Sequence, residues 1–326
     1  MRRGIVIRMP LSEKKLIQRI RRSAIQLSVG RKSIATGIGD DCAVLRVPAG
    51  HEMLVTTDFS IENIHFRRDW HPPELVGRRC LTRGLSDIAA MGGEPLAAFL
   101  SLAVASDVPQ KWVDRFLQGL LKLAKEFKLP LAGGDTAQST SGIQADIVVI
   151  GSLPKGKAVL RSGAKPGDQI YVTGKLGGSA AVLAGLLESK HLGSVPRQFR
   201  SQPRVAVGQW LRQRGVASAM IDLSDGLSTD LGHICQESDV GAEIDAEAIP
   251  RARVGSGKKQ VELRFALHGG DDYELLFTSA AKIPSQLGGV RVTRIGRITS
   301  SAGMRLMGAD GKARRLRAEG WEHFKR

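Results

Sequence analysis

The sequence has few cysteines, few aromatic residues and no long apolar run. Its three cysteines, Cys42, Cys80 and Cys235, lie far apart among 326 residues and form no C-x-x-C pair. Neither a disulfide framework nor a zinc site is therefore indicated. No run reaches the roughly 18 apolar residues that cross a membrane, and the apolar stretch in "MRRGIVIRMPLSEKK" is too short for a signal-peptide core. We expect a cytoplasmic protein without a membrane partner.

Basic residues outnumber acidic ones. The 48 Lys and Arg against 32 Asp and Glu give a net charge of +16, and residues 1–35 carry ten basic side chains against the single acid Glu13. Such an excess suits nucleic acid, a membrane surface or small polyanions. Aromatic residues make up only 5% and are not interleaved with the basic ones as stacking platforms require. A basic solvated surface is the commoner explanation, so we predict no nucleic-acid partner.

The hydrophobic pattern predicts an α/β protein built in α+β layers. Short β-rich runs alternate with longer helical patterns, and 42% hydrophobic residues suffice for two cored domains. Strands are predicted over 53–58, 145–153 and 168–174. Helices are predicted over the basic segment 12–27, from Pro72 and Pro73 to a stop at Gly92 and Gly93, and over 110–129.

A cluster of Gly, Pro and Lys over 151–168 marks a candidate domain boundary. The predicted organisation is a basic N-terminal helix or tail over 1–35, an N-terminal domain over 36–153, and a C-terminal α/β domain over 154–326.

Carboxylates gather at predicted strand ends and glycine-rich turns. They are Asp40, Asp41, Asp58, Asp135, Asp222, Asp225, Asp271 and Asp272, and Asp87 lies within a predicted helix. Clustered carboxylates repel one another unless their pKa values rise or cations fill the gap. With seven histidines and scattered cysteines, the oxygen ligands of Asp with the hydroxyls of Thr56, Thr57 and Ser224 suit Mg²⁺, which shares its waters with phosphates. This implies phosphate chemistry.

Each of these patterns has a purely structural alternative. A "GDD" or "GGD" is commonly a turn with a capping acid, and "DLSDG" also suits a strand followed by a capped helix. Asp87 could lie on the solvated face of its helix. The segment "TGKLGGSAAVLAGLL" (173–187) could hold an anion on its amides or form a tight strand-to-helix turn, and it matches no Walker-type loop.

The motifs together resemble one family. In chain order they are "GIGDDCAVL", "TTDFSIENIHF", "LSDIAAMGGEP", "AGGDT", "VLRSGAKPGDQIYVTGKLGGSAAVL", "IDLSDGLSTDLGHI" and "GGDDYELLF". This series closely resembles the thiamine-monophosphate kinase family, from about Gly37 to the closing "EGWEHF". The broader superfamily includes aminoimidazole ribonucleotide synthetase and selenophosphate synthetase.

The resemblance implies a two-domain fold of the aminoimidazole ribonucleotide synthetase type. Its N-terminal domains pair in a homodimer and bind ATP and several Mg²⁺, and its C-terminal domain completes the active-site cleft. The implied reaction converts ATP and thiamine monophosphate to ADP and thiamine diphosphate, the last step of thiamine diphosphate biosynthesis.

The resemblance also implies site residues at matching positions. The implied metal ligands are Asp41, Thr56, Thr57, Asp58, Asp87, Asp135, Asp222 and Asp225. The implied ATP contacts are Gly134, Asp135, Arg161 and Ser224, and the implied contacts to thiamine monophosphate are His65, Asp271 and Trp321. Asp271 departs from the family pattern, which often has Glu there, and the shorter side chain would reach substrate through water.

The implied mechanism is direct in-line transfer with no covalent phosphoenzyme, because the recognised motifs offer no His or Cys nucleophile. Three alternatives remain: a sister synthetase with another acceptor, a nucleotide-binding regulator without chemistry, and a nucleic-acid binder that uses the basic charge.

Overall fold

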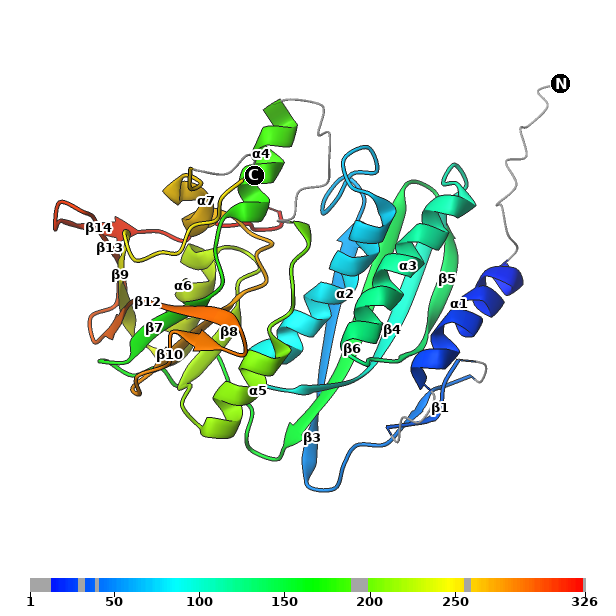
Figure 1. Ribbon diagram of the computed structural model, residues 1–326, viewed down its shortest axis with the longest axis horizontal. Helices are drawn as coiled ribbons and strands as arrows, with labels where there is room; N and C mark the ends of the chain where they lie inside the picture. The colour runs from blue at the N-terminus through cyan, green and yellow to red at the C-terminus, as the bar shows by residue number, and fades with distance from the viewer. Residues whose placement is uncertain (1–12, 29–32, 39–40, 189–198, 255–258, 325–326) are drawn as a thin grey trace. The chain divides into compact units, whose positions relative to one another are not determined.

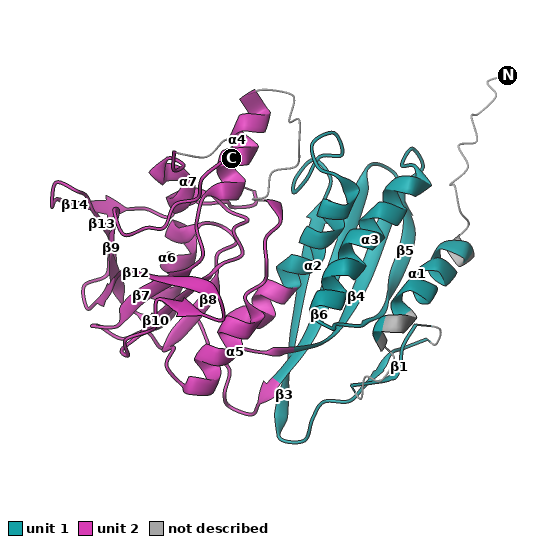
Figure 2. Cartoon of the chain, viewed as in Figure 1, with its two compact units in different colours: residues 1–84, 95–152 teal, residues 85–94, 153–326 magenta. Residues whose placement is uncertain are grey.

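A computed structural model describes residues 13–28, 33–38, 41–188, 199–254 and 259–324. The expected tail at the very N-terminus lies outside these ranges. The chain divides into two compact units, residues 1–84 with 95–152 (unit 1) and residues 85–94 with 153–326 (unit 2), as Figure 2 shows. Within the described ranges, no helix is both long and apolar enough to span a membrane.

Unit 1 is a four-stranded sheet with helices packed beside it (Figure 1). Its elements are α1 (Glu13–Ser28), β1 (Ile34–Thr36), β2 (Val44–Leu45), β3 (His51–Ile61), α2 (Pro73–Ala90), β4 (Glu94–Ala105), α3 (Gln110–Glu126), β5 (Leu131–Ser139) and β6 (Ile143–Pro154). The strand order is β3-β6-β4-β5, and β1 pairs with β2 separately. β4 and β5 run parallel, with Ser101 opposite Asp135.

The helices of unit 1 form where the sequence pattern favours them. α2 begins at Pro73 with Glu74 in its first turn, which suits the positive end of the helix dipole, and Gly92 follows its end with a φ of 71°. The apolar stripe of α3 is buried, with Phe116 and Leu120 both 0% exposed. α1 packs on β5 and α3, and its Leu16, Ile20 and Ala24 are buried.

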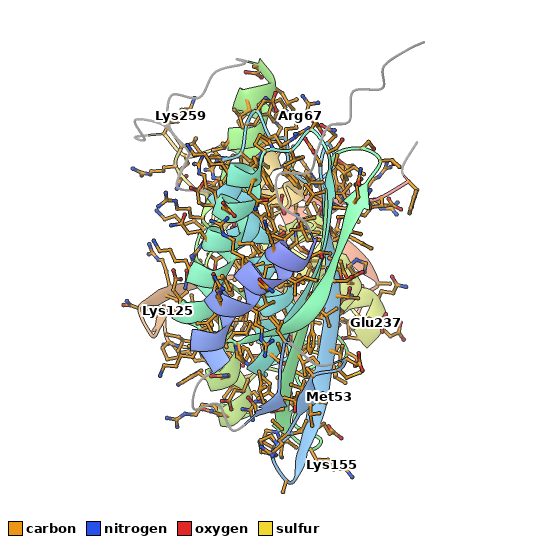
Figure 3. All side chains as sticks on the ribbon, turned by 90° about the vertical axis from the view of Figure 1, so that its right-hand side faces the viewer. Met53, Arg67, Lys125, Lys155, Glu237 and Lys259 are labelled. Atoms are coloured by element: carbon orange, nitrogen blue, oxygen red, sulfur yellow. The ribbon has the colours of Figure 1, made fainter. Side chains whose placement is uncertain are left out.

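The unit 1 sheet has two unlike faces. α2 and α3 cover one face (Figure 1). On β3 the burial pattern alternates, and Met53, Val55 and Phe59 are 54%, 60% and 56% exposed. Figure 3 shows Met53 and Lys125 of α3 on opposite sides of unit 1. An edge strand with three exposed large apolar side chains is uncommon on a solvated surface.

Unit 2 is an eight-stranded mixed sheet with helices α4 to α7. Its elements are β7 (Gln169–Thr173), α4 (Gly178–Glu188), α5 (Val205–Arg214), β8 (Ala219–Asp222), α6 (Leu227–Ser238), β9 (Gly241–Asp245), α7 (Leu263–His268), β10 (Leu275–Ser279), β11 (Gln286–Leu287), β12 (Val290–Thr299), β13 (Gly303–Met307) and β14 (Ala313–Leu316). The strand order is β14-β13-β9-β12-β7-β10-β8, with β11 on β12. Its core includes Ile170, Ile221, Leu231 and Leu276.

The predicted elements are present with small shifts at their ends. The strands predicted over 53–58, 145–153 and 168–174 are β3, β6 and β7, and the three predicted helices are α1, α2 and α3. The predicted helix over 110–129 ends at Glu126, because Lys128 takes a left-handed conformation with a φ of 51°.

Candidate functional site

The end of β3 presents its polar residues to two different faces. Side chains alternate along a strand, so Thr56 and Asp58 belong to one face and Thr57 to the other. Asp58 Oδ1 lies 4.0 Å from a guanidinium nitrogen of Arg83 in α2. On the opposite face, the Thr57 hydroxyl donates to Asp146 Oδ1 at 2.7 Å. The side chains of the "TTD" run are therefore not gathered at one point.

A pocket in unit 1 brings three of the predicted residues together. It has a volume of about 550 Å³, and Asp41, Gly134 and Asp135 line it beside apolar side chains such as Phe99. The hydroxyl oxygen of Thr136, on the same wall, is buried without a hydrogen-bond partner in the described structure. A largely apolar pocket lined by a few polar groups, here including two carboxylates, is the form expected of a small-molecule site.

Gly134 is required where β5 approaches β4. Its φ is 144°, and a Cβ there would lie 1.9 Å from the carbonyl oxygen of Leu100. Any other residue would separate the two strands, so glycine keeps Asp135 at its place on the pocket wall.

His65 is held by its own turn. Its Nδ1 lies 3.0 Å from the backbone amide of Ile61, which donates to it. The neutral ring must therefore carry its proton on Nε2, which makes that nitrogen a donor. A phosphate oxygen accepts hydrogen bonds, so it is a suitable partner for this N–H group.

In unit 2 the turn after β8 carries Asp222 and Asp225. Asp222 is only 4% exposed, and the hydroxyl of Ser86 donates to its Oδ2 at 2.7 Å. Asp87, the next residue on α2, is half-buried. Residues 85–90, the last part of α2, belong to unit 2, and the structure places them beside the end of β8 in the same unit, which brings the Asp87 and Asp222 segments together.

Asp230 is hydrogen-bonded to the turn that carries Asp222 and Asp225. Its carboxylate accepts hydrogen bonds from the backbone amides of Asp225 and Gly226, at 3.2 and 3.0 Å. Burial, followed by the charges of Asp222 and Asp225, raises the pKa of Asp230 well above its usual range. Asp225, Asp230 and His233 also bring their ligand atoms within 4.8 Å of one another, a spacing that could hold a cation.

The "GGDDYE" segment is hydrogen-bonded along the same turn. The amide of Asp271 donates to the carbonyl of Ser224, and the amide of Tyr273 donates to the carbonyl of Leu223, both at 2.8 Å. Asp271 has a φ of 66°, and its Oδ1 accepts a hydrogen bond from the Tyr273 hydroxyl at 2.6 Å. Ser224 and Asp271 are therefore neighbours in space.

Asp272 lies at the start of α4, the place where the sequence left open an anion site or a tight turn. Its carboxylate accepts a 2.7 Å hydrogen bond from the amide of Gly177, directly before α4. Burial raises the pKa of Asp272 well above its usual range, and the nearby Glu274 and Asp271 add to the effect. Because the Gly177 amide already donates to the carboxyl group of Asp272, the structure favours the tight-turn interpretation of "TGKLGG".

Trp321 and Arg161 lie at different places in unit 2. The Trp321 amide donates to the carbonyl of Asp225 at 3.0 Å, while the residue as a whole is 51% exposed. Its ring therefore does not anchor the segment in the core. The Arg161 carbonyl accepts from the hydroxyl of Ser238, the last residue of α6, so its backbone lies at the opposite end of that helix from Asp225.

Sequence reasoning missed three residues that contact the predicted ones: Ser86, Asp146 and Asp230. Ser86 lies on α2 beside the buried apolar residues Leu85 and Ile88, and Asp146 interrupts the run "ADIVVIGSL". A polar residue that interrupts an apolar run was the available signal. Its partner could not be read from the sequence, because the contacts span 136 residues for Ser86 and 89 for Asp146.

Comparisons with known proteins agree with the resemblance seen in the motifs. The family models described as AIR synthase related protein, N-terminal domain and C-terminal domain, match residues 39–153 and 165–308. The thiamine-monophosphate kinase of Escherichia coli strain K12 is 39% identical over 310 residues, which cover 90% of this chain and 93% of that protein.

Two solved structures are also similar over nearly the whole chain. The crystal structure of thiamine-monophosphate kinase from Stenotrophomonas maltophilia K279a has a TM-score of 0.79 at 33% identity, covering 93% of this chain and 98% of its own. A structure described as AaThiL complexed with AMPPCP and TMP has a TM-score of 0.73 at 30% identity and covers 99% of both chains. The predicted two-domain fold is confirmed, and the chain belongs to the AIR synthase related family and, within it, to the thiamine-monophosphate kinases.

Proposed function

We propose that this protein transfers the terminal phosphoryl group of ATP to the phosphate of thiamine monophosphate, giving ADP and thiamine diphosphate. The observation that carries the proposal is the likeness, over 99% of the chain, to a structure described as complexed with AMPPCP and TMP. The carboxylates at strand ends and the unit 1 pocket are the features of this chain that support it.

The proposed metal ligands are Asp41, Thr56, Thr57, Asp58, Asp87, Asp135, Asp222 and Asp225. The fit to Mg²⁺ rests on donor chemistry, because carboxylate and hydroxyl oxygens are what this hard cation prefers. The hydroxyl of Thr136 beside Asp135 is buried without a hydrogen-bond partner among the described residues, which supports a ligand on that wall. When bound, Mg²⁺ neutralises phosphate charge and aligns the reacting oxygens.

The remaining contacts divide between the two substrates. We assign Gly134, Asp135, Arg161 and Ser224 to ATP, and His65, Asp271 and Trp321 to thiamine monophosphate. His65 offers Nε2–H to a phosphate oxygen. The exposed indole of Trp321 suits a cationic ring. The proposed ligands come from both domains, 36–153 and 154–326, so both domains contribute to the one reaction.

The transfer needs little proton movement from the protein. The acceptor phosphate has a second pKa of about 6 and is mostly ionised at neutral pH, so no strong general base is required. An acceptor oxygen forms the new bond to the terminal phosphorus as the bond to the ADP oxygen breaks. The carboxylates hold cations, and His65 orients the acceptor. Covalently labelled protein after turnover with ATP carrying a labelled terminal phosphate would refute the direct transfer.

We propose a homodimer that forms through the N-terminal domain. The exposed apolar side chains Met53, Val55 and Phe59 on β3 support a second copy as the occupant of that face. Val55→Asp should convert a dimer to a monomer by light scattering coupled to size exclusion, whereas Glu52→Asp should leave the mass unchanged. A monomeric wild-type protein at micromolar concentration would refute this assembly.

The cytoplasm remains the proposed location, and nucleic acid remains outside the proposed partners. Salt-sensitive binding of DNA or RNA without ATP turnover would instead favour the nucleic-acid alternative, because phosphate contacts release counterions.

The test is an incubation of the purified protein with ATP, Mg²⁺ and thiamine monophosphate, with chromatography of the products. We expect equal amounts of ADP and thiamine diphosphate, and no diphosphate when free thiamine is the acceptor. ADP without thiamine diphosphate would point to a sister synthetase with another acceptor. Nucleotide binding without turnover would point to a regulator, and either result overturns the proposal.

A further inference from the structure

The segment that carries Trp321 is fastened to the first turn of α6 by its backbone. Three consecutive amides donate to that turn or to the residue before its N-cap: Glu319 to the hydroxyl of Ser228 at 3.3 Å, Gly320 to the hydroxyl of Thr229 at 3.0 Å, and Trp321 to the carbonyl of Asp225 at 3.0 Å. The last two strand residues before this segment are Arg315 and Leu316 of β14. The segment is therefore docked by hydrogen bonds at defined positions.

The docking is close enough to require glycine at its centre. A Cβ on Gly320 would lie 2.1 Å from the carbonyl oxygen of Asp225 and 2.6 Å from the Thr229 hydroxyl. Such distances are far inside van der Waals contact, so the backbone of the segment lies directly on the Asp225 turn.

The Trp321 ring takes no part in these three hydrogen bonds, which all start from backbone amides. Trp321 is 51% exposed, and its ring makes an edge contact with the ring of His323, with the centroids 5.7 Å apart. An indole on a fixed backbone with much of its surface open presents a face to a flat or cationic ring. The backbone amide of Trp321 lies one hydrogen bond from the Asp225 turn, so the point from which the ring projects keeps a set distance from that turn.

Thr229 is the side chain through which this spacing can be tested. Ser228 shares its hydroxyl with Nδ1 of His268 at 2.9 Å, and Asp225 contributes a backbone atom. The Thr229 hydroxyl, in contrast, accepts a hydrogen bond from the Gly320 amide and can be removed by a side-chain substitution. We propose that Thr229 is a positioning residue, which acts through Gly320 to hold Trp321 for the thiazolium and pyrimidine rings of thiamine monophosphate.

This inference rests on the proposed function, and its test separates the two. Thr229→Val removes the hydroxyl at nearly constant shape, and Thr229→Ser keeps it. Thr299→Val is the matched control, because it removes a hydroxyl that donates to the Ser301 carbonyl at 3.2 Å at the end of β12. Two readouts are compared in all proteins: hydrogen exchange of the amides of residues 319–321, and the KM and kcat values for both substrates.

We expect Thr229→Val to lose protection at residues 319–321 and to raise the KM for thiamine monophosphate about five-fold, as for the loss of one hydrogen bond. The kcat and the KM for ATP should stay unchanged, since binding rather than the transfer step is affected. Thr229→Ser and Thr299→Val should match the wild type.

Retained protection in Thr229→Val would overturn the docking role of Thr229. Lost protection with an unchanged KM for thiamine monophosphate would overturn the link between Thr229 and the acceptor, and so would an equal change in both KM values. If the wild type makes no thiamine diphosphate, the proposed function and the acceptor part of the inference fail together, while hydrogen exchange still decides whether Thr229 holds the segment.

Discussion

Replacing Asp272 by asparagine should flatten the dependence of stability on pH. Asp272 is buried, and burial raises the pKa of its carboxyl above that of the unfolded chain. Just above the ordinary carboxyl pKa, the native state therefore holds a proton that the unfolded state has released. The free energy of unfolding falls as the pH rises through this interval and becomes constant above the folded pKa. Asparagine keeps an oxygen that accepts from the Gly177 amide, but its side chain does not titrate in this pH range.

The size of the effect follows from the linkage relation. One titrating group changes the free energy of unfolding by at most about 1.4 kcal/mol per pH unit. With a urea m-value of about 2 kcal/mol/M, the urea midpoint of the wild type should fall by about 0.7 M per pH unit relative to Asp272→Asn. Asp230, whose pKa is raised in the same direction, titrates in both proteins and cancels in the difference.

The assay is a set of urea titrations at half-unit steps from pH 4 to pH 8, in the presence of a chelator. Asp310→Asn is the control of opposite sign, because its hydrogen bond to Arg314 lowers the pKa of Asp310. Asp310 therefore contributes stability that is lost as the pH falls through its folded pKa. A difference between wild type and Asp272→Asn that does not vary with pH would refute the reasoning.

Three further changes test the site. Ser86→Ala removes the 2.7 Å hydrogen bond to Asp222 and should destabilise the protein by about 1.5–3 kcal/mol in urea titrations; an unchanged midpoint would contradict this. Gly134→Ala places a Cβ 1.9 Å from the Leu100 carbonyl and should weaken ATP binding in calorimetry, whereas Gly185→Ala, whose added Cβ would meet no described atom within 4 Å, should bind as the wild type does. Asp58→Asn and Asp222→Asn should fold by circular dichroism yet lose Mg²⁺-dependent turnover, and wild-type rates would remove them from the ligand set.

Local patterns in the sequence predicted three strands and three helices of the fold, mostly in its N-terminal half. The three- and four-residue spacing of Trp112, Phe116, Leu120 and Leu123 predicts a helix with one buried face, and the structure buries that face. The apolar run of β6 and the Pro and Gly punctuation around α2 are equally local. The acids were predicted at strand ends because a polar residue that closes an apolar run can be seen in the sequence alone.

The partners of those acids were decided only by the tertiary structure. The sequence treats Asp271 and Asp272 as two similar acids, but the fold makes Asp271 a neighbour of Ser224 and buries Asp272 against Gly177, 95 residues away. Likewise, the fold connects Asp225 to Trp321 through the backbone.

The sequence by itself determined the elements, the family and the positions of the acids, since these depend on spacing within a few residues. Strand order and loop pairing determined that Asp222 faces a hydroxyl and that Asp230 accepts hydrogen bonds from backbone amides. They also placed Thr229 against the segment that carries Trp321. Burial and charge at a site depend on segments that meet only after the chain has folded, so the pKa values of Asp230 and Asp272 are properties of the tertiary structure.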